Sequence, residues 1–184
     1  MIVRVFGGWD FKSGDDKNPD YVKIGYDKGV PMGGELHRAE QDKSPTFIVT
    51  AVKDPMGANL DRVQMVKGWR DSAGKLHEKV HDIAWSDAKT RKTDAKGKLP
   101  PVGNSVNVAE ATWTNTIGDV QLSTVWQDPD FDPDEQAFYY VRVLEIPTPR
   151  WTAYDAKLFG VTMGPEVPMT TQERAYTSPI WYIP

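Results

Sequence analysis

Apolar residues occur along the chain in short segments, and most of these segments have the alternation or the β-branched content of β-strands. Glycine, proline and aspartate gather between the segments, where turns require them. The strand-like segments are residues 2–6, 21–26, 46–52, 60–69, 75–85, 109–114, 120–126, 138–146 and 178–183. We expect seven or eight of them to form strands joined by turns.

Three features of this pattern predict how the strands are arranged. Residues 46–52 are apolar on both faces, which predicts a strand in the interior of a sheet. Residues 60–69 and 75–85 flank the turn-forming sequence Asp71-Ser72-Ala73-Gly74 and predict a β-hairpin. Residues 138–146 have the highest density of β-branched and aromatic residues and predict the strongest strand.

One short helix is expected, at residues 152–159. Thr152 and Asp155 have the spacing of a capping box, with aspartate in place of glutamate, and Gly160 stands where a helix would end. The sequence therefore predicts a helix of about two turns between the last strands.

Residues 12–20 and 86–103 are polar and rich in turn-forming residues, which predicts long polar loops. Many short strands with regular turn signals are typical of a sandwich of two sheets. We therefore predict an all-β protein, an antiparallel β-sandwich of immunoglobulin-like or related type, in which residues 1–184 form a single domain.

Composition and charge exclude several classes of function. The formal net charge of the 184 residues is −4, so the basic surface that nucleic acids require is missing. No apolar stretch approaches the ~18 residues of a membrane span, so we expect no membrane insertion. Cysteine is absent, which excludes disulfides, thiolate nucleophiles and cysteine-ligated zinc.

The sequence His77-Glu78-Lys79-Val80-His81 has the spacing of a zinc protease motif, which places two imidazoles on one face of a helix. This segment, however, follows the turn at Gly74 and is expected to be a returning strand. In an extended chain the two histidines lie about 13 Å apart, whereas Zn–N bonds measure about 2 Å. We predict solvent-facing strand histidines and no metal site, and a small zinc hydrolase is the less favoured alternative.

Residues 128–135 place aspartates at alternate positions, as calcium loops do. An EF-hand loop that begins at Asp128 requires glycine at its sixth position and glutamate at its twelfth, but Pro133 and Tyr139 stand there. We interpret the segment as an acidic, proline-stiffened turn that keeps the edge before the next strand soluble. An adventitious site for a hard cation is the alternative.

The sequence Gly29-Val30-Pro31-Met32-Gly33-Gly34 has neither the spacing nor the lysine of a nucleotide-binding loop. We expect its glycines to provide positive φ angles or close backbone approach. A structural turn is the favoured interpretation. In the alternative, Gly33 and Gly34 contact a ligand or another domain.

The loop after the strongest strand carries an arginine, two aromatic residues and a carboxylate, and such loops often hold recognition residues. Arg150 can bind an anionic group through its fork of donors while Trp151 or Tyr154 stacks on an apolar or sugar face. In the competing interpretation the two aromatic rings fill one end of the sandwich and Arg150 pairs with a carboxylate. The candidate ligand- or interface-contact residues are thus Gly33, Gly34, Arg150, Trp151, Tyr154 and Asp155.

Several sequence features together resemble one protein family. They are Phe6-Gly7-Gly8-Trp9-Asp10-Phe11, Gly29-Val30-Pro31-Met32-Gly33-Gly34, Lys53-Asp54-Pro55, and residues 59–69, 138–151 and 173–182. They resemble the C-terminal region of a large bacterial family, the domain of unknown function 3604. Full-length members look like metallohydrolases of the polymerase-and-histidinol-phosphatase type, with a histidine-x-histidine metal motif in their N-terminal part.

The histidines of this chain are His37, His77 and His81, and they include no such pair. The resemblance therefore implies that the metal-binding half lies outside residues 1–184 and that no residue here has a catalytic role or holds a cofactor. The start of a strand at residue 2 agrees with a piece of a longer chain. The sequence leaves the oligomeric state and the compartment open, and the lack of a signal peptide in these residues is compatible with an exported or periplasmic parent protein.

We thus expect a non-catalytic C-terminal module whose partner is the upstream catalytic domain of the same parent chain. The module would brace that domain and lend Arg150, Trp151 and the turn at Gly33 and Gly34 to the rim of its active site. An independent carbohydrate- or small-ligand-binding module is the alternative, suggested by the seven tryptophans and the loop after Pro147. For sugar binding, an exposed pair of coplanar aromatic rings is needed.

Overall fold

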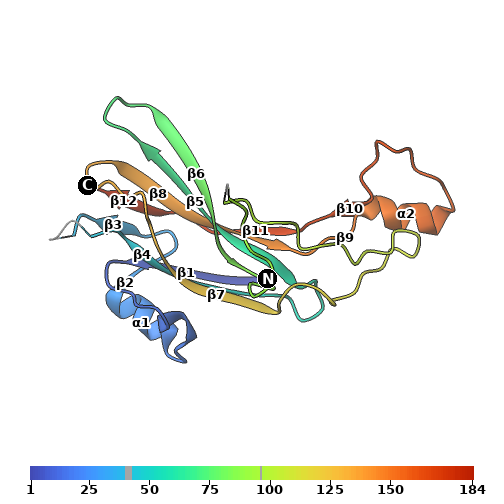
Figure 1. The fold of residues 1–184 in the computed structure, drawn as a ribbon, viewed down its shortest axis with the longest axis horizontal. Coiled ribbons are helices and arrows are strands. Elements are labelled where there is room, and N and C mark those ends of the chain that lie inside the picture. The colour runs from blue at the N-terminus through green and yellow to red at the C-terminus, as the bar shows by residue number, and fades with distance from the viewer. Residues whose placement is uncertain (40–42, 96) are drawn as a thin grey trace.

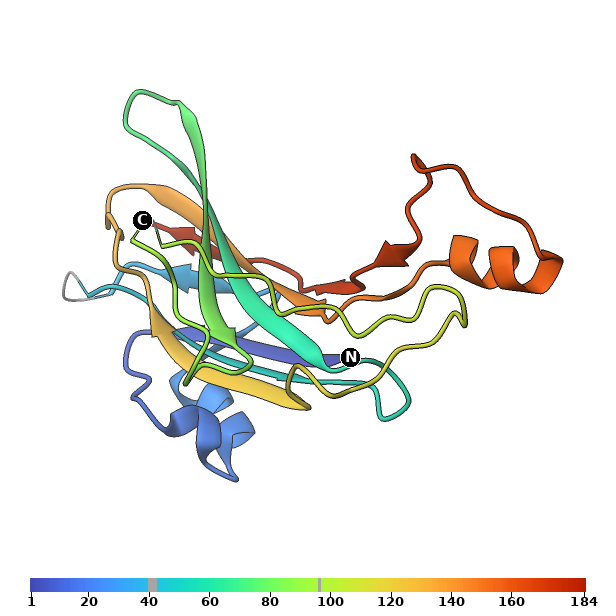
Figure 2. The same cartoon turned by 45° about the vertical axis from the view of Figure 1, so that its right-hand side comes forward.

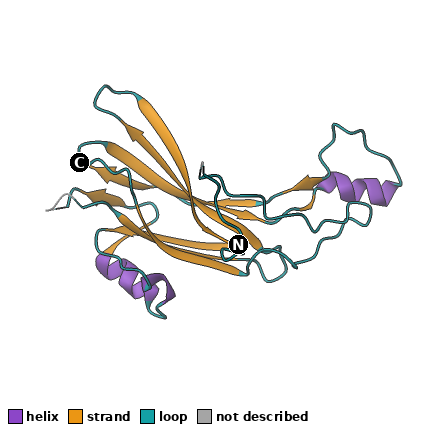
Figure 3. Cartoon of the chain, viewed as in Figure 1, coloured by secondary structure: helices purple, strands orange, loops and turns teal. Residues whose placement is uncertain are grey.

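Most of the chain is β-structure. The computed structural model describes residues 1–39, 43–95 and 97–184. In these residues the strands form several mostly antiparallel sheets, and two short α-helices and one 3-10 turn lie outside them (Figure 3).

The first sheet has four antiparallel strands in the order β2-β1-β4-β7. These strands are β1 (Ile2–Gly8), β2 (Gly29–Pro31), β4 (Thr46–Val52) and β7 (Gln121–Gln127). Strand β4 lies between β1 and β7, and all its residues except Val52 are buried. The predicted interior strand is therefore confirmed.

The second sheet has six strands in the order β3-β12-β8-β5-β6, with β11 pairing with β8. These strands are β3 (Glu35–His37), β5 (Leu60–Arg70), β6 (Leu76–Trp85), β8 (Gln136–Glu145), β11 (Arg174–Tyr176) and β12 (Ile180–Ile183). Strands β5 and β6 form the predicted hairpin, which rises from the sheet in Figure 1. The pair β3–β12 is parallel, so the expectation of a wholly antiparallel arrangement is wrong at this edge.

The inward faces of the two sheets contribute to one hydrophobic core. Val5, Phe47 and Leu122 of the first sheet belong to the same buried cluster as Met65 and Val141 of the second. In Figure 1, β1, β4 and β7 lie below β5, β8 and β12. The alternation of buried and half-buried residues along β8 shows how a strand with one face in this core is formed.

The remaining strands, β9 (Thr148–Pro149) and β10 (Thr170–Thr171), pair with each other and flank the helix α2 (Trp151–Phe159). We call residues 148–171 the α2 arm. Figures 1 and 2 both show it extending away from the two large sheets. The predicted helix is confirmed, and Gly160 ends it in the left-handed conformation, with φ +64°.

The predicted capping box of α2 is wrong. The N-cap residue is Arg150, and its side chain makes no capping hydrogen bond. The Thr152 hydroxyl instead donates to the carbonyl oxygen of Pro168, 2.5 Å away. Thr152 therefore bonds the helix to another part of the arm and does not serve as its N-cap.

Two predicted strands are absent from the structure. Residues 21–26 lie in helix α1 (Tyr21–Lys28), which follows the 3-10 turn η1 (Asp15–Lys17). Residues 108–111 form a turn that is closed by a single bridge between Asn107 and Thr112, and residues 113 and 114 have no regular secondary structure. In segments this short, a period of two cannot be told from a helical period, so packing decides.

Helix α1 is held by a second, smaller apolar cluster. Phe6, Phe11 and Ile48 pack there with Tyr21 and Ile24 of the helix. This cluster covers the face of the first sheet that points away from the main core, as the position of α1 below that sheet in Figure 1 shows.

Candidate functional site

The predicted turn at Gly33 and Gly34 has a structural role between β2 and β3. Gly33 has φ +89°, and a Cβ on Gly34 would lie 2.9 Å from the Cβ of Val30. The Gly33 amide donates to the carbonyl oxygen of Pro179, and the Trp181 amide donates to that of Gly34, both at 3.0 Å. The turn therefore fastens β12 to the parallel strand β3, and its polar backbone groups are engaged.

The other predicted contact residues begin helix α2. Trp151 and Tyr154 are exposed, and Asp155 is half-buried. The Arg150 guanidinium lies over the Trp151 ring, 5.7 Å from its centroid, a cation–π distance. The interpretation in which the two aromatic rings fill an end of the protein is wrong, because they face outward.

The structure does not bring the two groups of candidate residues together. The turn at Gly33 and Gly34 is bound to β12, whereas Arg150 and Trp151 lie on the α2 arm. Figures 1 and 2 place β3 and α2 at opposite ends of the protein. They therefore form two separate surfaces.

The zinc-protease-like sequence lies in a strand, as expected. His77 pairs with Trp69 and His81 with Met65 in the β5–β6 ladder. Residues four apart in a strand are about 13 Å apart, so the two imidazoles cannot hold one ion. The expectation that both histidines face solvent is wrong, because their side chains lie on the inward side of β6: His77 stacks on Trp69 at 5.0 Å and His81 packs on Trp126 at 5.2 Å.

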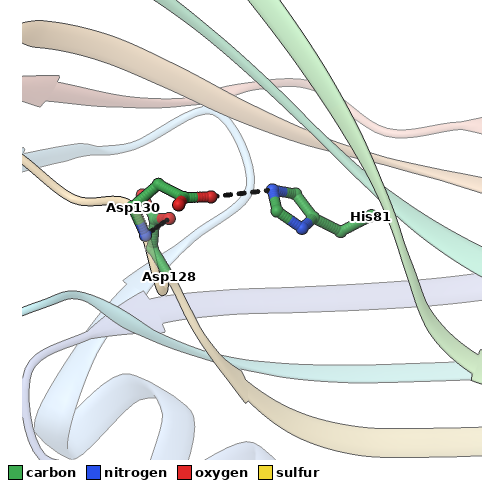
Figure 4. A group of neighbouring side chains, drawn as sticks. All are labelled: His81, Asp128 and Asp130. Carbon is green, nitrogen blue, oxygen red and sulfur yellow. Dashed lines mark hydrogen bonds and ion pairs between the residues drawn. The ribbon is translucent and has the colours of Figure 1, made fainter. Parts of the chain in front are cut away.

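A buried ion-pair cluster surrounds Asp128, the first residue after β7. The Lys67 ammonium lies 2.7 Å from Asp128 Oδ2 and donates to the Asp130 carbonyl oxygen at 2.7 Å. The Tyr139 hydroxyl donates to Asp128 Oδ2 at 2.8 Å. Figure 4 shows His81 pointing toward Asp130, with its Nε2 4.0 Å from Asp130 Oδ2.

His81, Asp128 and Asp130 hold possible metal-ligand atoms within 4.8 Å of one another. Two lysines, however, already neutralise these carboxylates, because Lys67 pairs with Asp128 and Lys79 with Asp130. A divalent cation would have to displace one ammonium group or lie beside both. We therefore assign the cluster to holding the fold together. Asp128 is buried, so the predicted solvating turn is correct only for the exposed part of residues 128–135.

The cluster shifts the proton affinities of its members. Burial lowers the pKa of His81, and the nearby Lys79 ammonium lowers it further. The hydrogen bond from Lys79 lowers the pKa of the Asp130 carboxyl. Burial and the adjacent Asp128 carboxylate raise the pKa of the Tyr139 hydroxyl. These shifts favour a neutral His81 imidazole, a neutral Tyr139 hydroxyl and a charged Asp130 carboxylate.

A groove lies on the outer face of the second sheet, formed by residues of four strands. Gly68 pairs with both Phe138 and Glu78, and Phe138 pairs with Trp181. Directly paired residues point to the same face of a sheet, so these side chains form one row. In the next row Arg70 pairs with Leu76 and Gln136. We call this feature the outer groove. Its volume is about 480 Å³.

The floor of the outer groove requires glycine. A Cβ on Gly68 would lie 2.3 Å from the Phe138 ring, so the ring leans over this position from the neighbouring strand. Trp181, which is 43% exposed, packs against Phe138 with ring centroids 5.4 Å apart. The groove thus has an aromatic wall and, in Arg70, Glu78 and Gln136, a polar rim.

Sequence reasoning missed this groove, although one signal was present. Phe138 and Tyr140 alternate with the buried Ala137, Tyr139 and Val141, so they had to point away from the core. The sequence could not show that β5, β6 and β12 bring further side chains to the same place. The helical spacing of the apolar residues Trp151, Tyr154 and Leu158 was likewise visible in the sequence. The sequence did not show that these side chains are exposed.

The fold and its surfaces define a mostly β protein with two sheets around one core and two distinct exposed apolar features, the α2 arm and the outer groove. The model of a family described as "Protein of unknown function (DUF3604)" matches residues 1–184. The chain belongs to this family, which confirms the resemblance. Searches of curated proteins and of solved structures found no match. No helix in the described residues is long and apolar enough to span a membrane.

Proposed function

We propose that residues 1–184 form a non-catalytic β-sandwich module, of immunoglobulin-like or related type, in a larger metal-dependent hydrolase-like protein. The module docks against the catalytic domain of that protein through the α2 arm. The observation that carries this proposal is the exposed apolar face of α2.

Four large apolar side chains of α2 are exposed, at positions that span its whole length. Trp151 is 61%, Tyr154 46%, Leu158 76% and Phe159 69% exposed. Trp151, Tyr154 and Leu158 follow each other at helical spacing and share one side of the helix. Fully burying such a side chain stabilises a protein by about 1.5–3 kcal/mol, and apolar patches of this kind mark interaction sites.

The arm holds α2 in an orientation that keeps this face outward. Thr152 and Ala153 are buried, and the Thr152 hydroxyl is bonded to Pro168. Lys157 pairs with Glu110 at 3.0 Å, which links the helix to the loop beside it. Because these contacts occupy the other side of the helix, Trp151 and Leu158 are available to a partner. Arg150 and Asp155 lie at the border of the same surface.

Two further observations support a structural role. The main core is shared by both sheets, as in a sandwich. Among the described residues, the group of metal-ligand side chains around Asp128 is neutralised by Lys67 and Lys79. The Gly33–Gly34 turn is engaged with β12, so we do not include it in the docking surface.

The proposal is tested with a family member that carries both an upstream histidine-x-histidine domain and this region. The two parts are expressed separately, and the upstream part is captured through an affinity tag. We expect the module to be retained, and the double variant Trp151→Ser, Leu158→Ser to be lost from the column. The matched control is Met56→Ser, which removes an exposed apolar side chain from the loop between β4 and β5, outside the arm, and should leave retention unchanged.

Retention of the double variant at the wild-type level would show that α2 is not the docking surface. Metal-dependent hydrolysis of phosphoesters or esters by residues 1–184 alone would overturn the non-catalytic assignment.

A further inference from the structure

The rim of the outer groove contains hydrogen-bonding groups that the protein itself does not use. The side chains of Arg70, Glu78 and Gln136 border the groove and have no hydrogen-bond or ion-pair partner among the described residues. A guanidinium, a carboxylate and an amide together provide donors and acceptors for vicinal hydroxyl groups. A small number of well-positioned polar groups beside an aromatic wall is typical of a small-molecule site.

The aromatic wall continues along the sheet at nearly regular intervals. Ring centroids lie 5.4 Å apart for Trp181 and Phe138, 6.3 Å for Phe138 and Tyr140, and 6.4 Å for Tyr140 and Tyr176. The planes of Phe138 and Tyr140 are within 11° of parallel, whereas Trp181 is tilted by 54° from Phe138 and Tyr176 by 40° from Tyr140. A row of rings at such intervals suits a ligand made of repeated rings with apolar faces.

The size of the groove also suits such a ligand. Its volume of about 480 Å³ lies within the ~300–1,000 Å³ of small-molecule sites. A second hollow of about 450 Å³ shares Arg70 and Gln136 with it and is bordered by Asp71, Ser72 and Asp134. The two hollows adjoin at these shared side chains, so an extended ligand can occupy both.

Charge selects among extended ligands. Arg70 and Glu78 carry opposite charges at the groove, and of the two carboxylates at the second hollow Asp134 pairs with Arg38 and Asp71 is bonded to His77. The two hollows thus have no excess of positive charge to attract a polyanion, and the partnerless Arg70 and Glu78 are complementary to dipolar hydroxyl groups without net charge. We propose that the outer groove binds a neutral oligosaccharide, with its sugar rings on the aromatic row and its hydroxyl groups on Arg70, Glu78 and Gln136. This site is independent of the docking role of α2.

The test measures binding of neutral hexasaccharides of β-linked glucose, α-linked glucose, xylose and mannose to residues 1–184 by calorimetry. We expect a Kd between about 10 μM and 1 mM for at least one of them. Arg70→Ala and Glu78→Gln should each weaken that binding about tenfold or more. Both side chains are exposed and without partners, so these variants keep the fold. Trp181→Ala should also weaken binding.

Tyr26→Ala is the matched control, because it removes an exposed aromatic side chain from α1, outside the groove and the α2 arm, and should leave the affinity unchanged. Four results would overturn the proposal: no binding of any hexasaccharide at about 5 mM, wild-type affinity in both Arg70→Ala and Glu78→Gln, preference for a polyanionic glycan, or a dimer in sedimentation that Trp181→Ala dissociates. Because α2 and the groove are altered separately, failure here is distinct from failure of the docking proposal.

Discussion

Lys67 is a charged residue on the inward face of a strand, between Met65 and Trp69. Its side chain is 3% exposed and that of its partner Asp128 is fully buried. The ammonium also lies 5.2 Å from the Trp69 ring and 5.9 Å from the Tyr139 ring. Lys67 belongs to the second sheet and Asp128 directly follows the first, so this ion pair joins the two sheets.

Replacing Lys67 by methionine removes the ammonium and keeps the length of the side chain. We expect a loss of about 3–5 kcal/mol in the free energy of unfolding, because the Asp128 carboxylate stays buried without a counter-charge. Urea denaturation measures this loss. Lys79→Met, which breaks the exposed pair with Asp130, should cost about 0–1 kcal/mol. Equal losses in the two variants would contradict the assignment.

His81 makes the free energy of unfolding depend on pH, and the direction of its pKa shift gives the sign of this dependence. Its pKa in the folded protein is lowered from 6.5 by burial and Lys79, against the opposing effect of Asp128 and Asp130. The unfolded chain therefore binds a proton at a higher pH than the folded protein does. The contribution of His81 to the free energy of unfolding is therefore complete above about pH 6.5. It is lost as the pH falls through the pKa that His81 has in the folded protein.

His81→Phe keeps an aromatic ring against Trp126 and removes the titration. We expect the free energy of unfolding to fall less between pH 7.5 and pH 5 in this variant than in the wild type. Chemical denaturation at several pH values measures the slopes. His37→Gln, at an exposed position, is the control and should keep the wild-type slope. Identical slopes in wild type and His81→Phe would contradict this role.

At the scale of elements, α1 shows packing overriding local preference. Gly25 is the buried residue of the helix, and a Cβ there would lie 2.4 Å from the Phe6 ring. Glycine costs a helix about 1 kcal/mol relative to alanine, yet here it allows α1 to approach β1 closely. Packing against Phe6 therefore favours glycine at this position, although alanine is the better helix former.

Gly25→Ala separates these two effects. Helix propensity alone predicts stabilisation by about 1 kcal/mol, whereas overpacking against Phe6 predicts destabilisation by about 1–3 kcal/mol. We expect net destabilisation in thermal or urea unfolding. Lys23→Ala, at an exposed position of the same helix, is the control and should leave stability nearly unchanged. A more stable Gly25→Ala protein would show that α1 is not closely packed on β1.

At the scale of the whole molecule, the α2 arm is separate from the core that holds the sheets. The main cluster draws its buried residues from the two large sheets, and none of them lies between residues 148 and 171. The ends of the arm are already side by side, because Pro149 pairs with Thr170. We therefore expect the arm to serve contact with a partner and not the stability of the fold.

Excision of the arm tests this separation. Replacing residues 150–169 by an Asn-Gly turn should leave the β-sheet circular dichroism unchanged, because such a turn closes a hairpin between Pro149 and Thr170. We expect the free energy of unfolding to change by about 2 kcal/mol or less, since the core is untouched. Loss of cooperative unfolding would show that the arm is part of the core.

The longer segments that the sequence predicted correctly share one property. Residues 46–52, 60–69, 75–85 and 138–146 are each long enough for their apolar pattern to identify a strand before any partner is known. Shorter segments carried too little pattern to decide: residues 2–6 do form a strand, whereas residues 21–26 form a helix. The strands β9, β10 and β11 have two or three residues each, so pairing with a neighbour alone defines them.

The candidate sites divide in the same way, into residues that are close in sequence and residues that only the fold brings together. Arg150, Trp151 and Tyr154 were recognised because they are neighbours in sequence and lie next to a strong strand. The outer groove was missed because Arg70, Glu78, Phe138 and Trp181 come from four strands. The ion pair of Lys67 with Asp128 was missed for the same reason: Asp128 was recognised only as part of an acidic segment, and nothing near either residue in sequence indicates a buried partner.

The amino-acid sequence by itself determined the main strands, the hairpin, the end of α2 at Gly160 and the family, because each depends on neighbouring residues or on a pattern of residues along the chain. Tertiary structure decided which face of each element is covered. It turned α2 outward, buried the ion pair of Lys67 with Asp128, and assembled the outer groove across β5, β6, β8 and β12. Exposure and long-range contact are set by packing between segments far apart in sequence, and local pattern carries no information about that packing.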